Sequence, residues 1–517
     1  MKRLPIGIST FRQIVEEDFV YIDKSRFVHA LDENGKYFFL SRPRRFGKTL
    51  LVETLKEAFE GNRELFRGLW LEDRWDWEKK HPVIHISLGG GVARNREELD
   101  RRIADVLEQN RQRLGIPRTD SRDIPGRFGE LIRKGADRFG RRTVVLIDEY
   151  DKPILDNISD AARASEIREG LKNLYSVVKD SDGWVRFAFL TGVSKFSKVS
   201  LFSGLNNLID ITLDPEFGNI CGYTEPELLA AFSEHLEDRS LDEIRRWYDG
   251  YNWLGENIYN PFSILNYFRS GEFRNYWFET GTPAFLLKKI LSRRYLFPSL
   301  ENIRATENLL GSFDLDAIEI ETLLFQTGYL TIREKRRVGN MISYRLDFPN
   351  LEVKMSFADS VSAYLVSGRS AYEANKLPLY ESLENGDIDG IERIFRALFA
   401  AIPHDWYRKN DIAGYEGYYA SIFYGYFAAL GLDVRAEDVT NRGRIDLTAK
   451  LGNRVYLFEF KVLDLDRSPG RALEQIREKR YAEKYRSEAA EIYLVGIEFD
   501  RKDRNIAGFA WERDGGA

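Results

Sequence analysis

The stretch "KYFFLSRPRRFGKTLLVETLKEAFEG", residues 36–61, decides the fold of the first half of the chain. It opens with an apolar run typical of a strand, passes through a turn containing Pro43 and Gly47, and continues with apolar residues at helical spacing. Strand, loop and helix in that order are the setting of a phosphate-binding loop, G-x-x-x-x-G-K-[ST], whose last part is matched here up to Thr49. The first glycine of that pattern would stand at position 42, where this chain has Arg42. The residues alone leave two alternatives open: a phosphate loop, or an exposed basic turn before a structural helix.

A phosphate loop would use five residues of this stretch. The unpaired amides at the start of the helix, together with the helix dipole, favour an anion. Lys48 can then reach the outer phosphates, and Thr49 can ligate Mg²⁺. Gly47 permits a close approach of the backbone, and Arg44 and Arg45 add positive charge. The expected ligand is therefore ATP with Mg²⁺.

A second strand-like segment ends in acidic residues. In "RRTVVLIDEYDKPIL" an uninterrupted apolar run, as expected for a parallel strand covered on both faces, is followed at once by Asp148 and Glu149. In an enzyme with a phosphate loop, such an Asp holds the hydrated Mg²⁺, and the next Glu polarises the attacking water. Acidic residues after a strand can instead cap a helix, which is the interpretation we favour for Asp151. The two elements in this order make an ATPase the stronger interpretation.

Two further strand-like runs complete the expected sheet. "VRFAFLTGV" ends near Thr191, which we expect to act as a polar sensor near the γ-phosphate. "HPVIHISL" adds another strand, and helical patterns separate these runs, so an α/β domain with a parallel sheet is predicted. His81 and His85 flank a strand, where four-residue spacing does not produce a ligand pair, and we interpret both as structural.

The middle of the chain shows no pattern that indicates chemistry. Residues 222–300 read as aromatic-rich helices, which suit a lid beside the sheet; their aromatic stripe could stack bases, but a core role is favoured. Residues 301–355 then give a helix, a strand ending in Ile332, a basic turn at Arg333–Arg337 and a strand through Leu346, an order consistent with a small winged-helix-like unit. That turn could touch phosphates, but a solvated hairpin tip is the favoured interpretation.

Three separated signals near the C-terminus can form one acidic site. "YEGYYASIFYGYFAALGLDV" predicts a helix with a buried stripe, and Glu416 lies on that stripe, where a carboxylate needs a partner such as a metal or a catalytic cleft. "GRIDLTAK" and "RVYLFEFKV" predict a hairpin that brings Asp446 beside Glu459, with Lys461 on the same face as Glu459. Two carboxylates with a lysine suit Mg²⁺ binding, water activation and neutralisation of a scissile phosphate. A structural hairpin with one surface ion pair is the alternative.

At this point a family resemblance can be stated. "RPRRFGKTL", "VVLIDEYDKPIL", "FLTGVSKFSKVSLFSGLNNL" and "NPFSILNYF" resemble the AAA-ATPase-like family of bacterial proteins that carry a nuclease-like domain at the C-terminus, over nearly the whole chain. The resemblance implies that an arginine-containing loop replaces the usual first glycine, so that Arg42 is a family trait. It also leaves a homo-oligomer open, because many ATPases of this kind complete their sites with an arginine from a neighbouring subunit.

The pattern E…D-(x12)-E-x-K, followed by "LEQIREKRYAEKY", resembles the PD-(D/E)XK nuclease superfamily over roughly the last hundred residues. This resemblance implies that Asp446 and Glu459 are metal ligands and that Lys461 positions the nucleophile or the phosphate. It further implies that Glu416 supports the metal and that Gln475 lines the site. The metal would be Mg²⁺, with Mn²⁺ as an alternative ion. The proline that usually precedes the first Asp is absent.

The totals limit the remaining choices. The chain of 517 residues, with 43% hydrophobic and 31% charged residues, is predicted to be folded and soluble. Its formal net charge of -5 argues against a surface that is basic throughout, so contact with nucleic acid must be local. Cys221 is the only cysteine, which excludes an intramolecular disulfide and fits a cytoplasmic protein. No signal peptide and no membrane-spanning segment are expected.

The predicted fold class is α/β: a P-loop parallel-sheet ATPase with a helical lid and a winged-helix-like unit, followed by an α/β PD-(D/E)XK nuclease domain. The expected domains are the AAA-like ATPase at 1–221, the lid at 222–300, the winged-helix-like unit at 301–355 and the nuclease-like domain at 356–517. The expected function is an ATP-regulated, Mg²⁺-dependent nuclease acting on nucleic acid, with DNA favoured over RNA. The alternative is a nucleotide-dependent signalling or binding module with an inactive nuclease fold.

Overall fold

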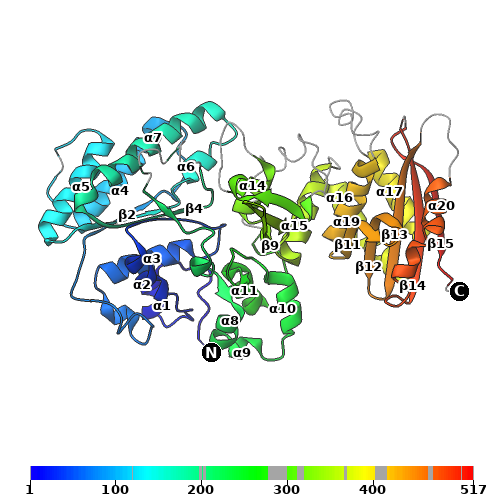
Figure 1. Cartoon of the computed structure of the whole chain (residues 1–517), viewed down its shortest axis with the longest axis horizontal. Coiled ribbons are helices and arrows are strands. Elements are labelled where there is room, and N and C mark those ends of the chain that lie inside the picture. The colour runs from blue at the N-terminus through cyan, green and yellow to red at the C-terminus, as the bar shows by residue number, and fades with distance from the viewer. Residues whose placement is uncertain are drawn as a thin grey trace. The chain divides into compact units, whose positions relative to one another are not determined.

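The computed structural model describes residues 2–118, 120–196, 201, 205, 207–277, 300–310, 319–365, 369–401, 416–463, 470–501 and 503–515 (Figure 1). The chain divides into two compact units. The first unit comprises Met1–Thr280 and Ile303–Asn350, and the second comprises Gly281–Asn302 and Leu351–Ala517.

In the described part of the first unit, five strands form a parallel sheet in the order β2-β3-β4-β1-β5. The strands are β1 (Tyr37–Ser41), β2 (Val83–Ser87), β3 (Thr143–Asp148), β4 (Val185–Gly192) and β5 (Ile209–Asp210). All residues of β1 and β3 are buried, as the apolar runs predicted for a sheet covered on both faces. Because β4 lies between β1 and β3, the carboxyl ends of these three strands meet at one edge of the sheet.

Helices cover both faces of this sheet. Figure 1 shows α4, α5 and α7 on one face and α1, α2 and α3 on the other. The helices are α1 (Phe11–Glu16), α2 (Arg26–Asn34), α3 (Lys48–Phe59), α4 (Arg96–Arg113), α5 (Ile124–Phe139), α6 (Lys152–Leu155) and α7 (Ala161–Asp180). Side chains cap the starts of α4, α5 and α7, where Asn95, Asp123 and Asp160 each accept a backbone N–H of the first turn.

An aromatic helical region follows in the first unit. It contains β6 (Tyr223–Thr224), α8 (Glu225–Ala231), α9 (Ser233–Leu236), α10 (Leu241–Tyr248), β7 (Ile258–Tyr259) and α11 (Pro261–Ser270). Tyr248, Tyr267 and Phe268 lie in one buried cluster with Val20 and Ile22 of the N-terminal segment. The core role predicted for these aromatic side chains is therefore confirmed.

The remainder of the first unit contains a small antiparallel sheet with the order β8-β10-β9 in its described residues. Its elements are β8 (Ile303–Thr306), α13 (Glu307–Leu310), α14 (Ile320–Thr327), β9 (Thr331–Val338) and β10 (Met341–Asp347). The predicted basic turn at Arg333–Arg337 is wrong, because these residues lie within β9 and the chain turns after Val338. Gly339, with φ of 61°, supplies the left-handed conformation of the turn, whereas charge alone does not distinguish a turn from an exposed strand.

The second unit contains a mixed sheet with the order β11-β12-β13-β14-β15 in its described residues. Its elements are α15 (Leu351–Leu365), α16 (Arg369–Asn385), α17 (Ile388–Ala401), α19 (Glu416–Ala429), β11 (Asp433–Thr440), β12 (Gly443–Leu451), β13 (Arg454–Leu463), α20 (Arg471–Glu478), β14 (Glu491–Asp500) and β15 (Ile506–Arg513). Phe423 of α19 packs against Phe458 and Phe460 on one face of β13, whereas Leu473 and Ile476 of α20 belong to the core on the opposite face. The predicted hairpin and the predicted alternation of its side chains are thus confirmed. Over the described ranges, no helix is both long and apolar enough to cross a membrane.

Candidate active sites

The loop between β1 and α3 has a backbone that suits an anion. Gly47 precedes the first residue of α3 and has φ of 92°, in the left-handed region where glycine is strain-free. Arg45 also has a positive φ, 68°. The loop therefore turns sharply and directs the start of α3, with its unpaired N–H groups, toward the carboxyl edge of the sheet.

Three of the predicted residues meet at this loop. The Oγ1 of Thr49 donates a hydrogen bond of 2.7 Å to Oδ2 of Asp148 at the end of β3. Lys48 is buried, and its Nζ donates to the carbonyl oxygens of Arg42 at 3.0 Å and Pro43 at 2.9 Å. Burial lowers the pKa of Lys48, against the opposing effect of Asp148. The hydroxyl and carboxylate expected to hold Mg²⁺ are therefore in contact, and the ammonium lies inside the loop.

Arg42, which stands where the usual pattern has glycine, stabilises the loop through its buried side chain. Its guanidinium is fully buried and donates to the carbonyl oxygens of Ser41 at 2.8 Å, Thr212 at 2.9 Å and Phe217 at 3.1 Å. It also lies 4.5 Å from the ring centroid of Trp253, and burial lowers its pKa to about 10. A side chain thus fixes the loop against the rest of the unit, at the position where the usual pattern has glycine.

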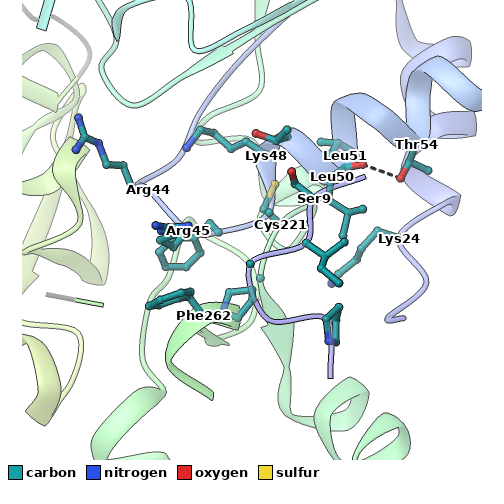
Figure 2. Close-up of a pocket in the computed structure, with 18 of the residues that line it drawn as sticks. Ser9, Lys24, Arg44, Arg45, Lys48, Leu50, Leu51, Thr54, Cys221 and Phe262 are labelled. Atoms are coloured by element: carbon teal, nitrogen blue, oxygen red, sulfur yellow. Dashed lines mark hydrogen bonds between the residues drawn. The ribbon is translucent and has the colours of Figure 1, made fainter. Parts of the chain in front are cut away.

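A cavity of about 590 Å³ opens beside the loop (Figure 2). Arg44, Arg45 and Lys48 of the loop line it together with Lys24 and Lys152. Figure 2 shows Arg45 beside Phe262, whose ring centroid is 4.7 Å from the guanidinium carbon. The apolar part is lined by Ile8, Ile14, Tyr21, Leu51, Ile220, Phe262 and Leu265. A volume of this order, lined by both cationic and apolar side chains, fits a nucleoside triphosphate. The N-terminal and α11 residues were not predicted as part of the site, because in sequence they look like ordinary core residues.

Two acidic residues after Asp148 have different surroundings. Glu149 lines the cavity with φ of 52°, and its carboxylate lies so close to Gly89 that an added Cβ there would be 2.6 Å from Oε2. Asp151 is buried and accepts the backbone N–H groups of Val193 at 3.1 Å and Ser194 at 2.5 Å. The capping interpretation of Asp151 is wrong, because its side chain makes no cap hydrogen bond to α6. Burial raises the pKa of Asp151 to about 6.

The other two predicted residues of this site make contacts with the protein itself. Thr191 is buried in β4, and its Oγ1 donates to the carbonyl of Leu40 in β1 at 2.9 Å. Arg44 is exposed, and its carbonyl accepts the indole N–H of Trp277 at 3.1 Å. Thr191 therefore links β4 to β1, the strand that leads into the loop.

In the second unit, the acidic site lies where two strands separate. β12 and β13 pair as far as Leu447 and Phe458, and beyond this point β12 pairs with β11 and β13 pairs with β14. Asp446 is the first residue of β12 past the last pair, and its Oδ2 accepts the N–H of Phe460 at 2.8 Å. A carboxylate thus takes the place of the missing strand partner, which explains why Asp446 interrupts an otherwise apolar strand.

The remaining predicted residues converge on the same gap. Oε1 of Glu459 accepts Nζ of Lys461 at 3.1 Å and also accepts the side-chain amide of Gln475 from α20. Glu416, at the start of α19, accepts the N–H of Val462 through Oε1 at 3.4 Å. The structure therefore brings all five residues of this predicted site together where β12 and β13 separate.

The charge balance of this site favours a cation. Glu459 is 1% exposed, and its Oε2 has no hydrogen-bond partner among the described residues. Burial and the charge of Asp446 raise the pKa of Glu459 to about 7, and burial also raises that of Asp446. Burial opposes the charged form of Lys461, but Glu459, Asp446 and Glu416 together raise its pKa.

A divalent cation would offset the excess negative charge, and carboxylate oxygens are the ligands that Mg²⁺ prefers. The buried, unpartnered Oε2 of Glu459 fits such a ligand. Across the described ranges, no three His, Cys, Asp or Glu side chains lie close enough together to hold a metal by themselves.

Glu498 was not predicted, although it positions part of the site. From β14 it accepts the N–H groups of Gly470 and Arg471, each at 2.8 Å, and so caps the start of α20. The adjacent Gly496 lets that helix approach closely, since an added Cβ would lie 2.3 Å from the N of Leu473. Glu498 thereby fixes the helix that carries Gln475. A single Glu in an apolar strand gives no sequence signal for this role.

Fold and site together define an AAA-type ATPase unit joined to a nuclease-superfamily unit. A family described as "Predicted AAA-ATPase" matches residues 5–202, and the PD-(D/E)XK nuclease superfamily matches residues 414–509, which confirms the resemblance drawn from the motifs. The chain is 53% identical over 512 residues to the "Uncharacterized protein in vnfD 5'region" of Azotobacter chroococcum mcd 1, covering 99% of each chain. It therefore belongs to the same family as that protein.

Among solved structures, the Orc1 protein of Aeropyrum pernix in complex with DNA is similar to this chain, with 14% identity and a TM-score of 0.28. The alignment covers 67% of this chain and 96% of the Orc1 chain. A likeness at this level supports no inference about fold or function.

Proposed function

We propose that this protein is an ATP-regulated, Mg²⁺-dependent nuclease that cleaves DNA in preference to RNA in the cytoplasm. The observation that carries the proposal is the convergence of Asp446, Glu459 and Lys461 at the gap between β12 and β13. Two carboxylates with raised pKa values beside a lysine are unfavourable as a purely structural arrangement, but they suit a metal-dependent phosphodiesterase. The single cysteine supports a reducing compartment.

At the first site, the chain's own residues would bind and orient ATP. Lys48 would exchange the carbonyls of the loop for the outer phosphates, and the exposed guanidinium groups of Arg44 and Arg45 would add positive charge. Thr49 and Asp148 would hold Mg²⁺, and Glu149 would orient the attacking water. The apolar side chains that line the cavity would exclude water from the base.

At the second site, Asp446 and Glu459 would hold Mg²⁺. When bound, the ion supplies Lewis acidity and lowers the pKa of a water molecule. Lys461 would neutralise the scissile phosphate or position the nucleophile, and Gln475 would orient Glu459 through the shared Oε1. Glu416 would support the metal from the start of α19.

A cleavage panel tests the proposal. The purified protein is incubated with plasmid, single-stranded DNA and RNA, with Mg²⁺ or Mn²⁺, and with or without ATP. We expect cutting by the wild type and by the control Lys450→Ala, whose lysine lies on β12 but pairs with Glu488 at 2.7 Å. Asp446→Ala and Lys461→Ala should abolish cutting, and undiminished cutting by both would refute the assignment. No cutting under any condition, with ATP binding retained, would favour the alternative of a nucleotide-dependent signalling or binding module.

A further inference from the structure

The β9–β10 ribbon of the first unit has an unusual exposed face. Because side chains alternate along a strand and cross-strand partners lie on the same side, the register assigns each residue to a face. The partners on the exposed face are Val338 with Met341, Arg336 with Ser343, Glu334 with Arg345, and Arg345 with Arg304 of β8. This face therefore carries three arginines and one glutamate, and it ends in an apolar pair beside the turn.

Two of the arginines of this face share one carboxylate. The side chain of Arg336 is 67% exposed and that of Arg345 is 38% exposed, and both donate to the single carboxylate of Glu334. Arg304 is also exposed. Arg336 and Arg304 therefore present exposed guanidinium groups on this face.

The opposite side of the same ribbon is basic near its tip. Lys335 and Arg337 alternate with Arg336 along β9, so they lie on the other face, and both are exposed. Basic side chains thus lie on both sides of the distal ribbon. A flat acidic surface could contact only one of these sides, whereas a groove between two phosphate backbones contacts both.

The apolar pair at the tip is exposed. Val338 is 54% exposed and Met341 is 62% exposed, on either side of the turn that contains Gly339. Exposed apolar side chains at the end of a basic ribbon are suited to a partner with an apolar interior between charged edges. The major groove of DNA has base edges between its phosphate backbones, it admits a two-stranded ribbon, and apolar side chains contact the thymine methyl groups there.

We infer that the β9–β10 ribbon binds a nucleic-acid duplex, with Val338 and Met341 in a groove and with Lys335, Arg336 and Arg337 against the phosphates on its two sides. The inference rests on the proposed function, since it names the surface that holds the substrate of the nuclease. It requires no cleavage, and it can therefore be tested with the nuclease silent.

The test measures binding of a fluorescent DNA duplex by anisotropy in EDTA at several salt concentrations. The duplex has about 25 base pairs, longer than the ≈ 16 bp that a double-stranded RNA-binding domain spans. The full-length triple variant Lys335→Ala, Arg336→Ala, Arg337→Ala should lose roughly 10- to 100-fold in affinity near 0.1 M salt, and the slope of log K against log[salt] should fall by about 2 to 3. The double variant Val338→Ser, Met341→Ser should bind several-fold more weakly with an unchanged slope. The matched control removes three exposed arginines of another region, Arg101, Arg118 and Arg122, and should bind like the wild type.

Three results would overturn the inference: a ribbon variant that binds like the wild type, a control that loses as much as the ribbon variant, or a wild type that does not bind the duplex. Thermal unfolding of each variant verifies that it is folded, which is expected because all the substituted side chains are exposed. Failure of the proposed function is distinguishable from these results. If the duplex binds through the ribbon but is not cleaved in Mg²⁺, the proposed function fails and the inference stands. If the ribbon variant binds and cleaves the duplex like the wild type, the inference fails and the proposed function stands.

Discussion

The two candidate sites use the same residue types with opposite charge balance. At the first site Lys48 donates hydrogen bonds to neutral carbonyls of its loop, and Asp148 accepts a hydrogen bond from the hydroxyl of Thr49. At the second site Lys461 contacts Glu459, and Asp446 adds to an excess of negative charge. The first site is prepared for an anion and the second for a cation. The difference comes from where the residues stand in the fold: at the start of a helix in one unit, and at the parting of two strands in the other.

The largest expected effect separates the two sites. Lys48→Ala should lower ATP turnover by about 10²–10³-fold, because it removes the ammonium of the loop that would contact the outer phosphates, and cleavage should become insensitive to ATP. Lys461→Ala should abolish cleavage while ATP turnover stays within about twofold of the wild type, since the catalytic groups of the first site are unaltered. Phosphate release and cleavage are measured on the same preparations, with Lys79→Ala as the control, since Lys79 is exposed and pairs with Asp76. Loss of ATP turnover in Lys461→Ala would contradict two separate sites.

Arg42→Gly restores the usual loop pattern, yet we expect it to harm the protein. The substitution leaves the carbonyls of Ser41, Thr212 and Phe217 without their donor and opens a cavity beside Trp253. The free energy of unfolding should fall by about 2–3 kcal/mol, seen as a lower midpoint of thermal unfolding. The exposed neighbour provides the control, Arg44→Gly, which should change the midpoint far less. Unchanged stability together with tighter ATP binding would show that glycine suits ATP binding better and that the Arg42 side chain does not stabilise the loop.

Local patterns predicted the parts of both sites that local geometry determines. The apolar runs identified β1, β3 and β13, and alternation placed Glu459 and Lys461 on one face, because strand and helix periodicity act over a few residues. The convergence of Asp446 with Glu459 followed from a single hairpin. These predictions needed only the printed order of residues and the geometry of regular elements.

Contacts between distant segments could not be predicted in this way. Asp151 resembled a helix cap, but it binds the amides of Val193 and Ser194, which only the packing of β3 beside β4 brings near. Glu498 caps a helix that lies more than twenty residues earlier in the chain, and an isolated glutamate shows no period. The prediction of a turn at Arg333–Arg337 was wrong for another reason. These residues lie in β9, and an exposed ribbon tolerates charged side chains on both faces.

The charge excess at the second site predicts a stability effect with a definite sign. The pKa of Glu459 is raised to about 7, so the folded protein keeps a proton that the unfolded chain loses from its ordinary pKa of 4.5 upward. Stability is therefore lost as the pH rises through this window, in the absence of metal. The side chain in Glu459→Gln has no proton to lose. Without metal at pH 8, the free energy needed to open β13 locally should therefore be about 1–2 kcal/mol higher in this variant than in the wild type, with little difference at pH 5.

Hydrogen exchange of peptides from β13 in EDTA measures this difference. The control Glu474→Gln changes an exposed glutamate of α20 and should leave protection unchanged at both pH values. Equal protection of wild type and Glu459→Gln at pH 8 would mean that the buried carboxylate carries no penalty, and the contrast between a site built for an anion and one built for a cation would weaken.

The smallest expected effect concerns Asp151, at the first site. Its carboxylate holds two backbone amides at the end of β4, and Gly192 leaves room for it, since an added Cβ would lie 2.2 Å from Oδ1. Asp151 thereby fixes the segment in which Glu149 adopts its left-handed conformation, so we regard it as a positioning residue.

Asp151→Asn keeps the size of the side chain but directs an amide toward two N–H donors, and it should lower kcat for ATP by roughly 3- to 10-fold with KM nearly unchanged, because Glu149 is displaced while the phosphate loop is not. The control Asp160→Asn alters the cap of α7 with a residue type that caps equally well, and it should leave both constants unchanged. If Asp151 had a purely structural role, the substitution would instead lower the stability of the protein without lowering kcat selectively over KM. An increase in KM without a change in kcat would mean that the segment shapes binding of the nucleotide and has no part in orienting Glu149.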